Sequence, residues 1–173
     1  MNKQQIKYYL ITLISAIAGI CLDQYTKFLA VTHLKDHKPF VIIQNVFELN
    51  YLENRGAAFG ILQNQQWFFI VSFLFIITIM ILLYIKLPTS KRFLPLHVCG
   101  ALIVAGAVGN LIDRLRLGYV IDFFYFSLID FPIFNVADIF VVTGVIFLAI
   151  VILFVYTEDE LDDLLSFRKM SRN

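Results

Sequence analysis

Residues 56–85 read GAAFGILQNQQWFFIVSFLFIITIMILLYI and contain no Asp, Glu, Lys or Arg. Charge is also absent from residues 93–112 and 139–157, and a shorter uncharged stretch covers residues 8–22. An α-helix needs about 20 mainly apolar residues to cross the hydrocarbon core of a bilayer. The sequence therefore predicts four transmembrane helices, at about residues 8–30, 66–86, 93–113 and 137–157.

The composition supports a membrane protein and excludes other classes. Hydrophobic residues make up 60% of the 173 residues, and the mean hydropathy is +0.79, whereas soluble domains are about 45–50% apolar. This content rules out a disordered chain. The formal net charge is only +1 and no basic stripe is present, so we expect no nucleic acid partner. Cys21 and Cys99 both lie inside apolar stretches, so we predict no disulfide.

The first predicted span has two interpretations. Two lysines, an apolar run and the sequence AIA at 16–18 imitate a cleavable signal peptide. The apolar run continues to Leu22, which favours an uncleaved span. Such a span must accommodate Asp23 and Lys27, and a charge at membrane depth is a functional hypothesis by default.

The distribution of basic residues predicts the orientation of the chain. Lysine and arginine are concentrated in the N-terminal tail and at residues 86–92, and cytoplasmic loops are enriched in these residues. We predict that both termini are cytoplasmic, including the tail at 158–173, and that the loops at 31–65 and 114–136 are extracytoplasmic. The expected fold is a single all-α integral membrane domain over residues 1–173, with four transmembrane helices.

The first outer loop has the alternation that is typical of a β-strand. Between residues 46 and 53, Phe47, Leu49 and Tyr51 fall on one face and mostly polar residues fall on the other. We predict a half-buried strand here. A second strand at 40–43 is expected to pair with it as a short sheet.

Small residues mark one face of the third span. Ala101, Ala105 and Gly109 recur every four residues. Because small side chains at this spacing let another helix approach closely, we interpret the stripe as a packing feature without chemistry.

Polar residues are scarce, so their positions carry information. Several lie at the outer ends of the predicted spans or in the outer loops, where they can converge on one layer. Asn110 and Arg114 share a helix face because they are four residues apart, and Asn135 and Asp138 do so at three. Arg114 and Arg116 are alternatively suited to contacts with lipid headgroups. The candidate site residues are Asp23, Asn54, Asn110, Asp113, Arg114, Asp122, Asn135 and Asp138.

Other candidates also have structural interpretations. Asn135 is suited to the N-cap of the fourth span, and Asp138 at position N3 then completes an acidic variant of a capping box. Asp23 and Lys27 are spaced as an i,i+4 ion pair at the membrane interface, worth a few tenths of a kcal/mol. Asp122 is suited to a solvated loop.

Most catalytic chemistries lack their motifs in this sequence. It contains no H-E-x-x-H, no C-x-x-C, no G-x-S-x-G and no P-loop. What remains is a surplus of carboxylates. Two carboxylates within hydrogen-bond distance do not both ionise cheaply, so one holds a proton near neutral pH while the other is a base. Aspartic proteases use such a pair to activate water, but the residues alone do not decide which acids meet.

Five motifs occur in order along the chain. They are DQYTK at 23–27, NRGAAFG at 54–60, GNLIDR at 109–114, VIDFF at 120–124 and FNVAD at 134–138. On a four-span chain of this length, this set closely resembles the bacterial lipoprotein signal peptidases, the signal peptidase II family. The resemblance covers residues 23–144.

The resemblance implies an intramembrane aspartic endopeptidase that removes signal peptides from prolipoproteins. It implies cleavage just before a cysteine that carries a diacylglyceryl group, in the bacterial inner (cytoplasmic) membrane near its extracytoplasmic face. It also implies a small extracytoplasmic β-sheet cradle and a second extracytoplasmic loop or helix. Asp122 and Asp138 match the catalytic pair, and Asp113 lies in a motif without an assigned role. The supporting or substrate-binding positions are Asp23, Asn54, Asn110, Arg114 and Asn135.

We expect lipidated prolipoproteins and membrane lipids as partners, a monomer, and neither a cofactor nor a metal. We further predict that the N-terminal end of the fourth span favours the ionised form of Asp138. Asp122 then holds the shared proton in the resting enzyme.

Two other functions compete with the peptidase. A small transporter or proton pathway also uses intramembrane acids, but it is expected to distribute them through the membrane depth, whereas these acids cluster at one boundary. A structural membrane protein, whose acids only cap helices, is the second alternative, and it predicts that replacing Asp122 by Asn leaves function untouched.

Overall fold

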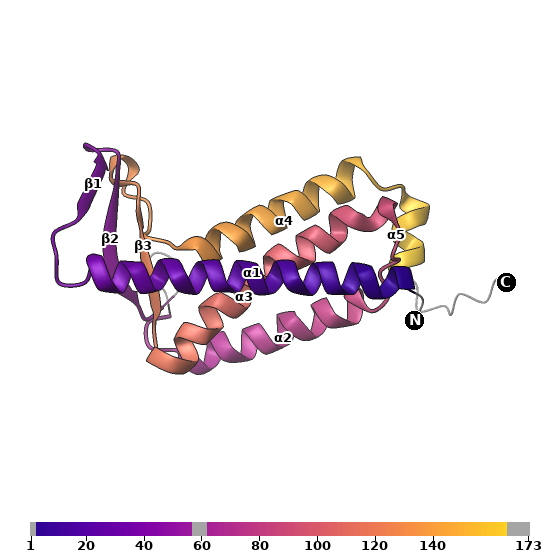
Figure 1. Ribbon diagram of the computed structural model, residues 1–173, viewed down its shortest axis with the longest axis horizontal. Helices are drawn as coiled ribbons and strands as arrows, with labels where there is room; N and C mark the ends of the chain where they lie inside the picture. The colour runs from indigo at the N-terminus through magenta and orange to yellow at the C-terminus, as the bar shows by residue number, and fades with distance from the viewer. Residues whose placement is uncertain (1–2, 57–61, 166–173) are drawn as a thin grey trace.

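The fold is built on a bundle of long apolar helices (Figure 1). The computed structural model describes residues 3–56 and 62–165, and residues 57–60 of the NRGAAFG motif lie outside the described residues. The long helices are α1 (Lys3–His33), α2 (Gln66–Tyr84), α3 (Leu94–Leu117) and α4 (Val136–Phe154). All four are long and apolar enough to cross a membrane, which confirms the prediction of four helices of spanning length.

Two of these helices extend beyond the spans predicted from hydropathy. α1 runs from Lys3 to His33, beyond both ends of the predicted span at 8–30, and it contains Asp23 and Lys27 as expected. α3 continues to Leu117 and ends at Gly118, whose φ of 77° is the left-handed conformation that glycine adopts at helix C-caps. Arg114, expected in the outer loop, therefore lies on the last turn of α3.

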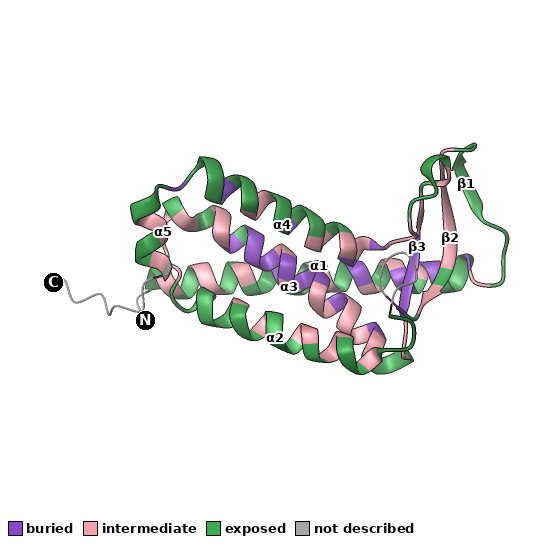
Figure 2. Ribbon diagram, turned by 180° about the vertical axis from the view of Figure 1, so that it is seen from behind, coloured by how far each residue is buried: buried purple, intermediate pink, exposed green. Residues whose placement is uncertain are grey.

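α3 is the central helix of the bundle. It carries most of the buried helical residues, whereas α2 has none (Figure 2). The apolar side chains of α2 are exposed on the outside of the bundle, as expected for a helix that faces lipid rather than a protein core. The bundle therefore keeps its buried polar residues on α1 and α3 and at the start of α4.

The predicted stripe of small residues packs α3 closely against its neighbours. A side-chain carbon added at Gly19 of α1 would lie 2.8 Å from Cβ of Ala105. One added at Gly106 would overlap the carbonyl oxygen of Ala137 in α4. Ala105 is 2% exposed. The stripe is thus a packing feature as predicted, and Gly106 belongs to the same contact.

A three-stranded antiparallel sheet stands across one end of the bundle (Figure 1). Its strands are β1 (Phe40–Ile43), β2 (Phe47–Asn54) and β3 (Val120–Tyr125), in the order β1-β2-β3. The pairing of β1 with β2 confirms the predicted short sheet. Ile121 and Phe123 of β3 pack against Ala30 and Leu34 at the end of α1, which fixes the sheet on the bundle.

The third strand was missed by the sequence analysis. We expected a loop or helix in the second outer segment, but β3 precedes a short 3-10 helix, η3 (Ser127–Ile129). In the register of the sheet, Leu52 pairs with Asp122 and Asn54 pairs with Val120. β3 therefore places Asp122 in the sheet, directly beside the strand that ends at Asn54.

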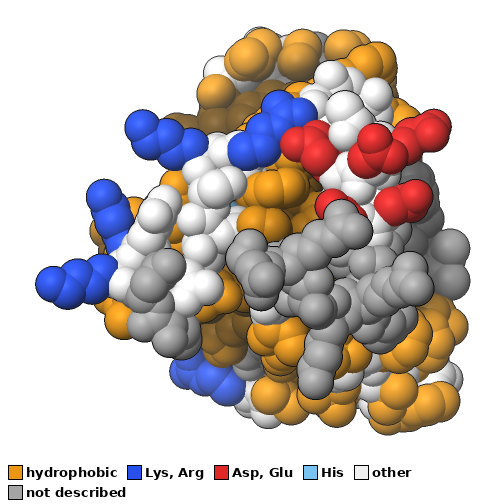
Figure 3. Space-filling view, turned by 90° about the vertical axis from the view of Figure 1, so that its right-hand side faces the viewer, with side chains coloured by type: hydrophobic (Ala, Val, Ile, Leu, Met, Phe, Trp, Pro, Cys, Tyr) orange, Lys and Arg blue, Asp and Glu red, His pale blue; other side chains and the backbone are white. Residues whose placement is uncertain are grey.

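The acidic tail forms a helix that was also not predicted. α5 (Glu158–Leu165) crosses the opposite end of the bundle from the sheet (Figure 1). Thr157 and Glu160 form a reciprocal capping box at its start. Arg92 donates to both carboxylate oxygens of Glu160, at 3.0 and 2.9 Å, and these hydrogen bonds lower the pKa of Glu160 to about 2. Figure 3 shows acidic side chains gathered beside basic ones on this end.

Candidate active site

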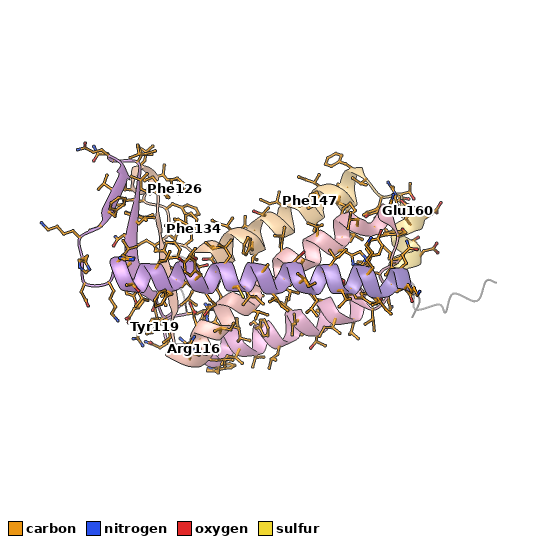
Figure 4. All side chains as sticks on the ribbon, in the orientation of Figure 1. Arg116, Tyr119, Phe126, Phe134, Phe147 and Glu160 are labelled. Atoms are coloured by element: carbon orange, nitrogen blue, oxygen red, sulfur yellow. The ribbon has the colours of Figure 1, made fainter. Side chains whose placement is uncertain are left out.

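Five of the predicted site residues line one pocket where the sheet meets α3 and α4. The pocket has a volume of about 510 Å³. Its polar wall contains Asn54, Asn110, Arg114, Asp122 and Asp138. The remaining wall is apolar and includes Phe134, which lies between the sheet and α4 (Figure 4).

Asp122 is a buried carboxyl group and not a solvated loop acid. The residue is 1% exposed. Its Oδ2 accepts a hydrogen bond from Asn54 Nδ2 at 2.8 Å, and its Oδ1 accepts one from Asn135 Nδ2 at 2.6 Å. Burial, followed by the nearby charge of Asp138, raises the pKa of Asp122 to about 7. Its proton is therefore retained at a pH where an ordinary aspartate has lost it.

Asp138 is part of the capping box that the sequence predicted. Asn135 is the N-cap of α4, and its Oδ1 accepts from the Asp138 backbone N at 3.0 Å. Asp138 Oδ2 accepts in return from the Asn135 backbone N at 3.1 Å. The second oxygen, Oδ1, accepts from Asn110 Nδ2 at 2.8 Å. The structural interpretation is thus confirmed, but the cap uses only one carboxylate oxygen and the same carboxyl group also lines the pocket.

Asn135 connects the two carboxyl groups. The residue is fully buried. Its side-chain oxygen and backbone nitrogen serve Asp138, while its Nδ2 lies within 2.6 Å of Asp122 Oδ1 and 3.0 Å of Asn110 Oδ1. One residue therefore fixes both acids of the pocket relative to the start of α4.

Asp23 lies outside the pocket, in a buried ion-pair cluster behind it. Lys27 Nζ lies 2.9 Å from Asp23 Oδ2 and 2.9 Å from Asp113 Oδ2, and the three side chains are at most 4% exposed. The expectation of an interfacial pair worth a few tenths of a kcal/mol is therefore wrong. Removing one partner of a buried pair leaves an uncompensated charge and costs about 3–5 kcal/mol.

This cluster also holds α4 and β3 in place. Asp23 Oδ1 accepts from the backbone N of Ala137 at 2.9 Å, one of the amides that lack a partner within α4. Asp113 Oδ2 accepts from the backbone N of Ile121 at 3.1 Å. Gln24 donates to Asp113 Oδ1 at 3.0 Å and lies 3.2 Å from Asp23 Oδ2. The cluster thus connects α1 and α3 to the two elements that carry Asp122 and Asp138.

Lys27 and Gln24 were not among the predicted site residues. Both lie in the DQYTK motif, and the charge of Lys27 within a predicted span was a signal that could have identified it. The structure adds a direct contact, because Lys27 Nζ donates to Asn110 Oδ1 at 2.9 Å.

Arg114 points into the pocket, which argues against its role as a headgroup anchor. Its guanidinium carbon lies 4.4 Å from the ring centroid of Phe69, and Nη2 donates to the carbonyl oxygen of Gly56 at 3.3 Å. Arg116 is exposed. A guanidinium has five N–H donors, so Arg114 offers the pocket a fixed positive charge with several donors.

The chain is similar to known proteins over most of its length. A family model described as signal peptidase (SPase) II matches residues 15–154. The lipoprotein signal peptidase of Clostridioides difficile (strain 630) is 49% identical over an alignment of 139 residues that covers 78% of this chain and 89% of that protein. The lipoprotein signal peptidase of Clostridium tetani is 41% identical over an alignment of 155 residues that covers 87% of this chain and 96% of that protein.

Solved structures share the fold. A bacterial membrane enzyme determined by the in meso method at 2.3 Å resolution has a TM-score of 0.72 and 29% sequence identity, over 94% of both chains. A second, at 1.9 Å resolution, has a TM-score of 0.71 and 31% identity, over 83% of this chain and 93% of the other. The likeness therefore covers the helices and the sheet together.

Proposed function

This chain belongs to the signal peptidase II family, and from that premise we propose that it is an aspartic endopeptidase with Asp122 and Asp138 as its catalytic pair. Its substrates are prolipoproteins that carry a diacylglyceryl group, and it cuts just before the modified cysteine. It works as a monomer in the bacterial inner membrane, at the extracytoplasmic face.

The observation that carries this proposal is the sharing of one pocket by two carboxyl groups, of which Asp122 is buried and Asp138 is half-buried. Asp122 and Asp138 both line the pocket, and Asn135 hydrogen-bonds to both. Two such acids do not ionise together cheaply, so one proton is shared by the pair. A proton donor and a base are then available side by side, as peptide hydrolysis requires.

The reaction follows from the two protonation states. Ionised Asp138 takes a proton from a water molecule, whose oxygen attacks the carbonyl carbon of the scissile peptide bond. Protonated Asp122 donates a hydrogen bond, and then its proton, to the carbonyl oxygen as charge develops there. The tetrahedral intermediate collapses when Asp138 gives its proton to the amide nitrogen and Asp122 takes a proton back from one of the two hydroxyl groups. The C–N bond breaks and leaves a free carboxylic acid and the amine of the lipidated cysteine.

The assignment of the two roles has separate support on each side. The pKa of Asp122 is raised to about 7 by burial and by the charge of Asp138, so a large fraction of Asp122 still holds its proton at neutral pH, where an ordinary aspartate is ionised. Asp138 is residue N3 of α4, where the positive end of the helix dipole favours a negative charge. Asp138 is therefore the base in the resting enzyme.

The apolar wall of the pocket suits a lipid-bearing substrate. Ile139 and Val142 line the pocket from α4 and are 42% and 55% exposed on the outside of the bundle. An acyl chain that lies along these residues stays in hydrocarbon, while the peptide bond reaches the polar end of the pocket. Arg114 is placed to hold carbonyl groups of the substrate backbone.

The transporter alternative receives less support from the same residues. A proton or ion pathway needs ionisable groups along the membrane depth. α2 contains no Asp, Glu, Lys or Arg, and Asp138 in the first turn is the only such residue in α4. The acids of the pocket and of the ion-pair cluster behind it therefore lie together at the end of the bundle that carries the sheet.

The proposal is tested by mixing the purified protein in liposomes with a diacylglyceryl-modified prolipoprotein and with the same precursor lacking the lipid. Mass spectrometry identifies the new termini. We expect one cut, directly before the modified cysteine, and no cut in the unmodified precursor. Cleavage elsewhere, equal cleavage of both precursors, or no cleavage by folded protein contradicts the proposed function.

A further inference from the structure

Lys27 is a fully engaged ammonium group behind the pocket. The residue is 1% exposed. An ammonium has three donors and no acceptor, and Lys27 Nζ has three partners, each at 2.9 Å: Asp23 Oδ2, Asp113 Oδ2 and Asn110 Oδ1. Two of these contacts balance its charge. The third reaches a residue of the pocket.

The contact with Asn110 determines which way the Asn110 amide faces. A side-chain amide has an acceptor end and a donor end of nearly the same shape, and its environment decides between the two orientations. Lys27 Nζ and Asn135 Nδ2 both donate to Asn110 Oδ1, at 2.9 and 3.0 Å. The reversed amide would place its NH2 group against the ammonium, donor facing donor.

The orientation of this amide has a consequence for Asp138. With its oxygen held by Lys27, Asn110 must present Nδ2 to Asp138 Oδ1, where the distance is 2.8 Å. Asp138 Oδ2 already accepts from the Asn135 backbone N. Both oxygens of Asp138 therefore face donors, an arrangement that fits a carboxylate. A reversed Asn110 would present an oxygen to Oδ1, and only a protonated Asp138 would then be satisfied.

We propose that Lys27 is a positioning residue for peptide hydrolysis: its ammonium fixes the Asn110 amide so that Asp138 stays ionised and able to act as the base. The inference rests on the proposed function, because it assigns Lys27 a part in the same reaction. Lys27 lies behind Asn110 and does not touch the substrate. The effect that we assign to Lys27 passes through Asn110, and it adds to the direct effect of the Lys27 charge on Asp122.

A double-mutant cycle measures this dependence. We compare wild type, Lys27→Met, Asn110→Ala and the double variant in liposomes, with a saturating lipidated prolipoprotein and circular dichroism to verify folding. Lys27→Met is expected to lower kcat by about tenfold or more, with KM within about twofold of wild type, because proton transfer and not binding is impaired. The double variant is expected to lose less than the product of the two single losses, because the orienting effect of Lys27 is gone once Asn110 is removed.

Gln24→Met is the matched control in the same cluster. Gln24 contacts Asp23 and Asp113, as Lys27 does, but it donates to the backbone carbonyl of Gly109 where Lys27 donates to Asn110. Loosening the cluster in this way is expected to leave kcat within about twofold of wild type. A loss as large as that of Lys27→Met would show that the cluster matters only for the fold, and would overturn the proposal.

Lys27→Met leaves two buried carboxylates without their cation. If it does not accumulate as folded protein, the cycle is repeated with Asp113→Asn in all four proteins, which removes one of those charges. If wild type cleaves and the loss of kcat in the double variant equals the product of the two single losses, the role of Lys27 is overturned. A folded but inactive wild type overturns the proposed function and this inference with it.

Discussion

Asn135 shows how one side chain serves both the fold and the site. Its Oδ1 caps α4, while its Nδ2 contacts Asp122 Oδ1 at 2.6 Å. From the sequence, the N-cap role and the site role of Asn135 were alternatives. In the structure they use different atoms of the same side chain. The capping role could be predicted from spacing alone. The contact with Asp122 depends on β3, which was not predicted.

In the proposed mechanism, the pKa of Asp122 sets the pH range of cleavage. Because this pKa is raised to about 7, the proton that activates the carbonyl is present below pH 7 and is lost above it. We expect kcat/KM to fall on the alkaline side with a midpoint near pH 7. The hydrogen bond from Asn54 favours the ionised form, so Asn54→Leu removes it and moves this midpoint to higher pH.

Rates measured from pH 5 to 9 with the lipidated substrate check this prediction. Asn50→Leu, four residues earlier on the same strand, is the control and is expected to keep the wild-type midpoint. A midpoint that stays unchanged in Asn54→Leu, or that moves to lower pH, contradicts the assignment of the alkaline limb to Asp122.

The residues of the site were predictable to different degrees. Asn54, Asn110, Arg114, Asp122 and Asp138 were selected through their motifs and all line the pocket. Lys27 was overlooked as a site residue because an i,i+4 pair with Asp23 is ordinary on a helix surface. Its burial depends on how α1 packs against α3, and no local pattern in the sequence records that.

At the scale of elements, the start of α4 allows the two roles of Asn135 to be separated. Serine is also a good N-cap but has no amide donor, so Asn135→Ser keeps the cap and loses the contact with Asp122. Both variants lose the buried hydrogen bonds of the amide, so we expect Asn135→Ser to be about 1 kcal/mol more stable than Asn135→Ala, which loses the cap as well. Both variants are expected to lose most of their activity.

Thermal unfolding in detergent and cleavage rates are measured on the same samples. A fully active Asn135→Ser would show that the amide donor is not needed in the site. An Asn135→Ser as unstable as Asn135→Ala would show that the cap does not stabilise α4.

Two glycines of α3 test the close packing of the helices. A Cβ at Gly106 would overlap the Ala137 carbonyl oxygen, whereas one at Gly100 would meet only ordinary contacts at 3.9 Å or more, from Met80 and Tyr84. We expect Gly106→Ala to lower stability by about 1–3 kcal/mol through overpacking. Gly100→Ala is the control and is expected to be neutral or slightly stabilising. Equal melting temperatures for the two variants would contradict this packing.

Helices and strands could be predicted where the sequence pattern that indicates them extends over enough residues. Uncharged stretches such as 93–112 are long enough to indicate spans, and the alternation at Phe47, Leu49 and Tyr51 indicated β2. β3 is short and buried, so VIDFFY does not alternate clearly. α5 carries the T-x-x-E capping signature at its start but too few apolar residues to have been expected as a helix.

At the scale of the whole molecule, the pocket lies at one end of the bundle, and its apolar wall includes residues exposed on the outside of the bundle. Val142 lines the pocket from α4, whereas Val145, one turn further, is 50% exposed and does not line it. If the acyl chains lie along this wall, Val142→Trp blocks them and raises KM for the lipidated precursor by about tenfold. Val145→Trp is expected to leave KM unchanged. Equal KM values in both variants would place the lipid elsewhere.

We propose that Asp122 and Asp138 together hydrolyse the peptide bond. The most direct measurement is the turnover of a lipidated prolipoprotein by Asp122→Asn and Asp138→Asn in liposomes, with circular dichroism to verify folding. Asp130→Asn is the control, because Asp130 is an exposed acid that contacts Tyr125. We predict that both dyad variants fold and lose about a thousandfold or more in kcat, while Asp130→Asn stays active. A folded Asp122→Asn or Asp138→Asn with near-normal turnover would contradict the account.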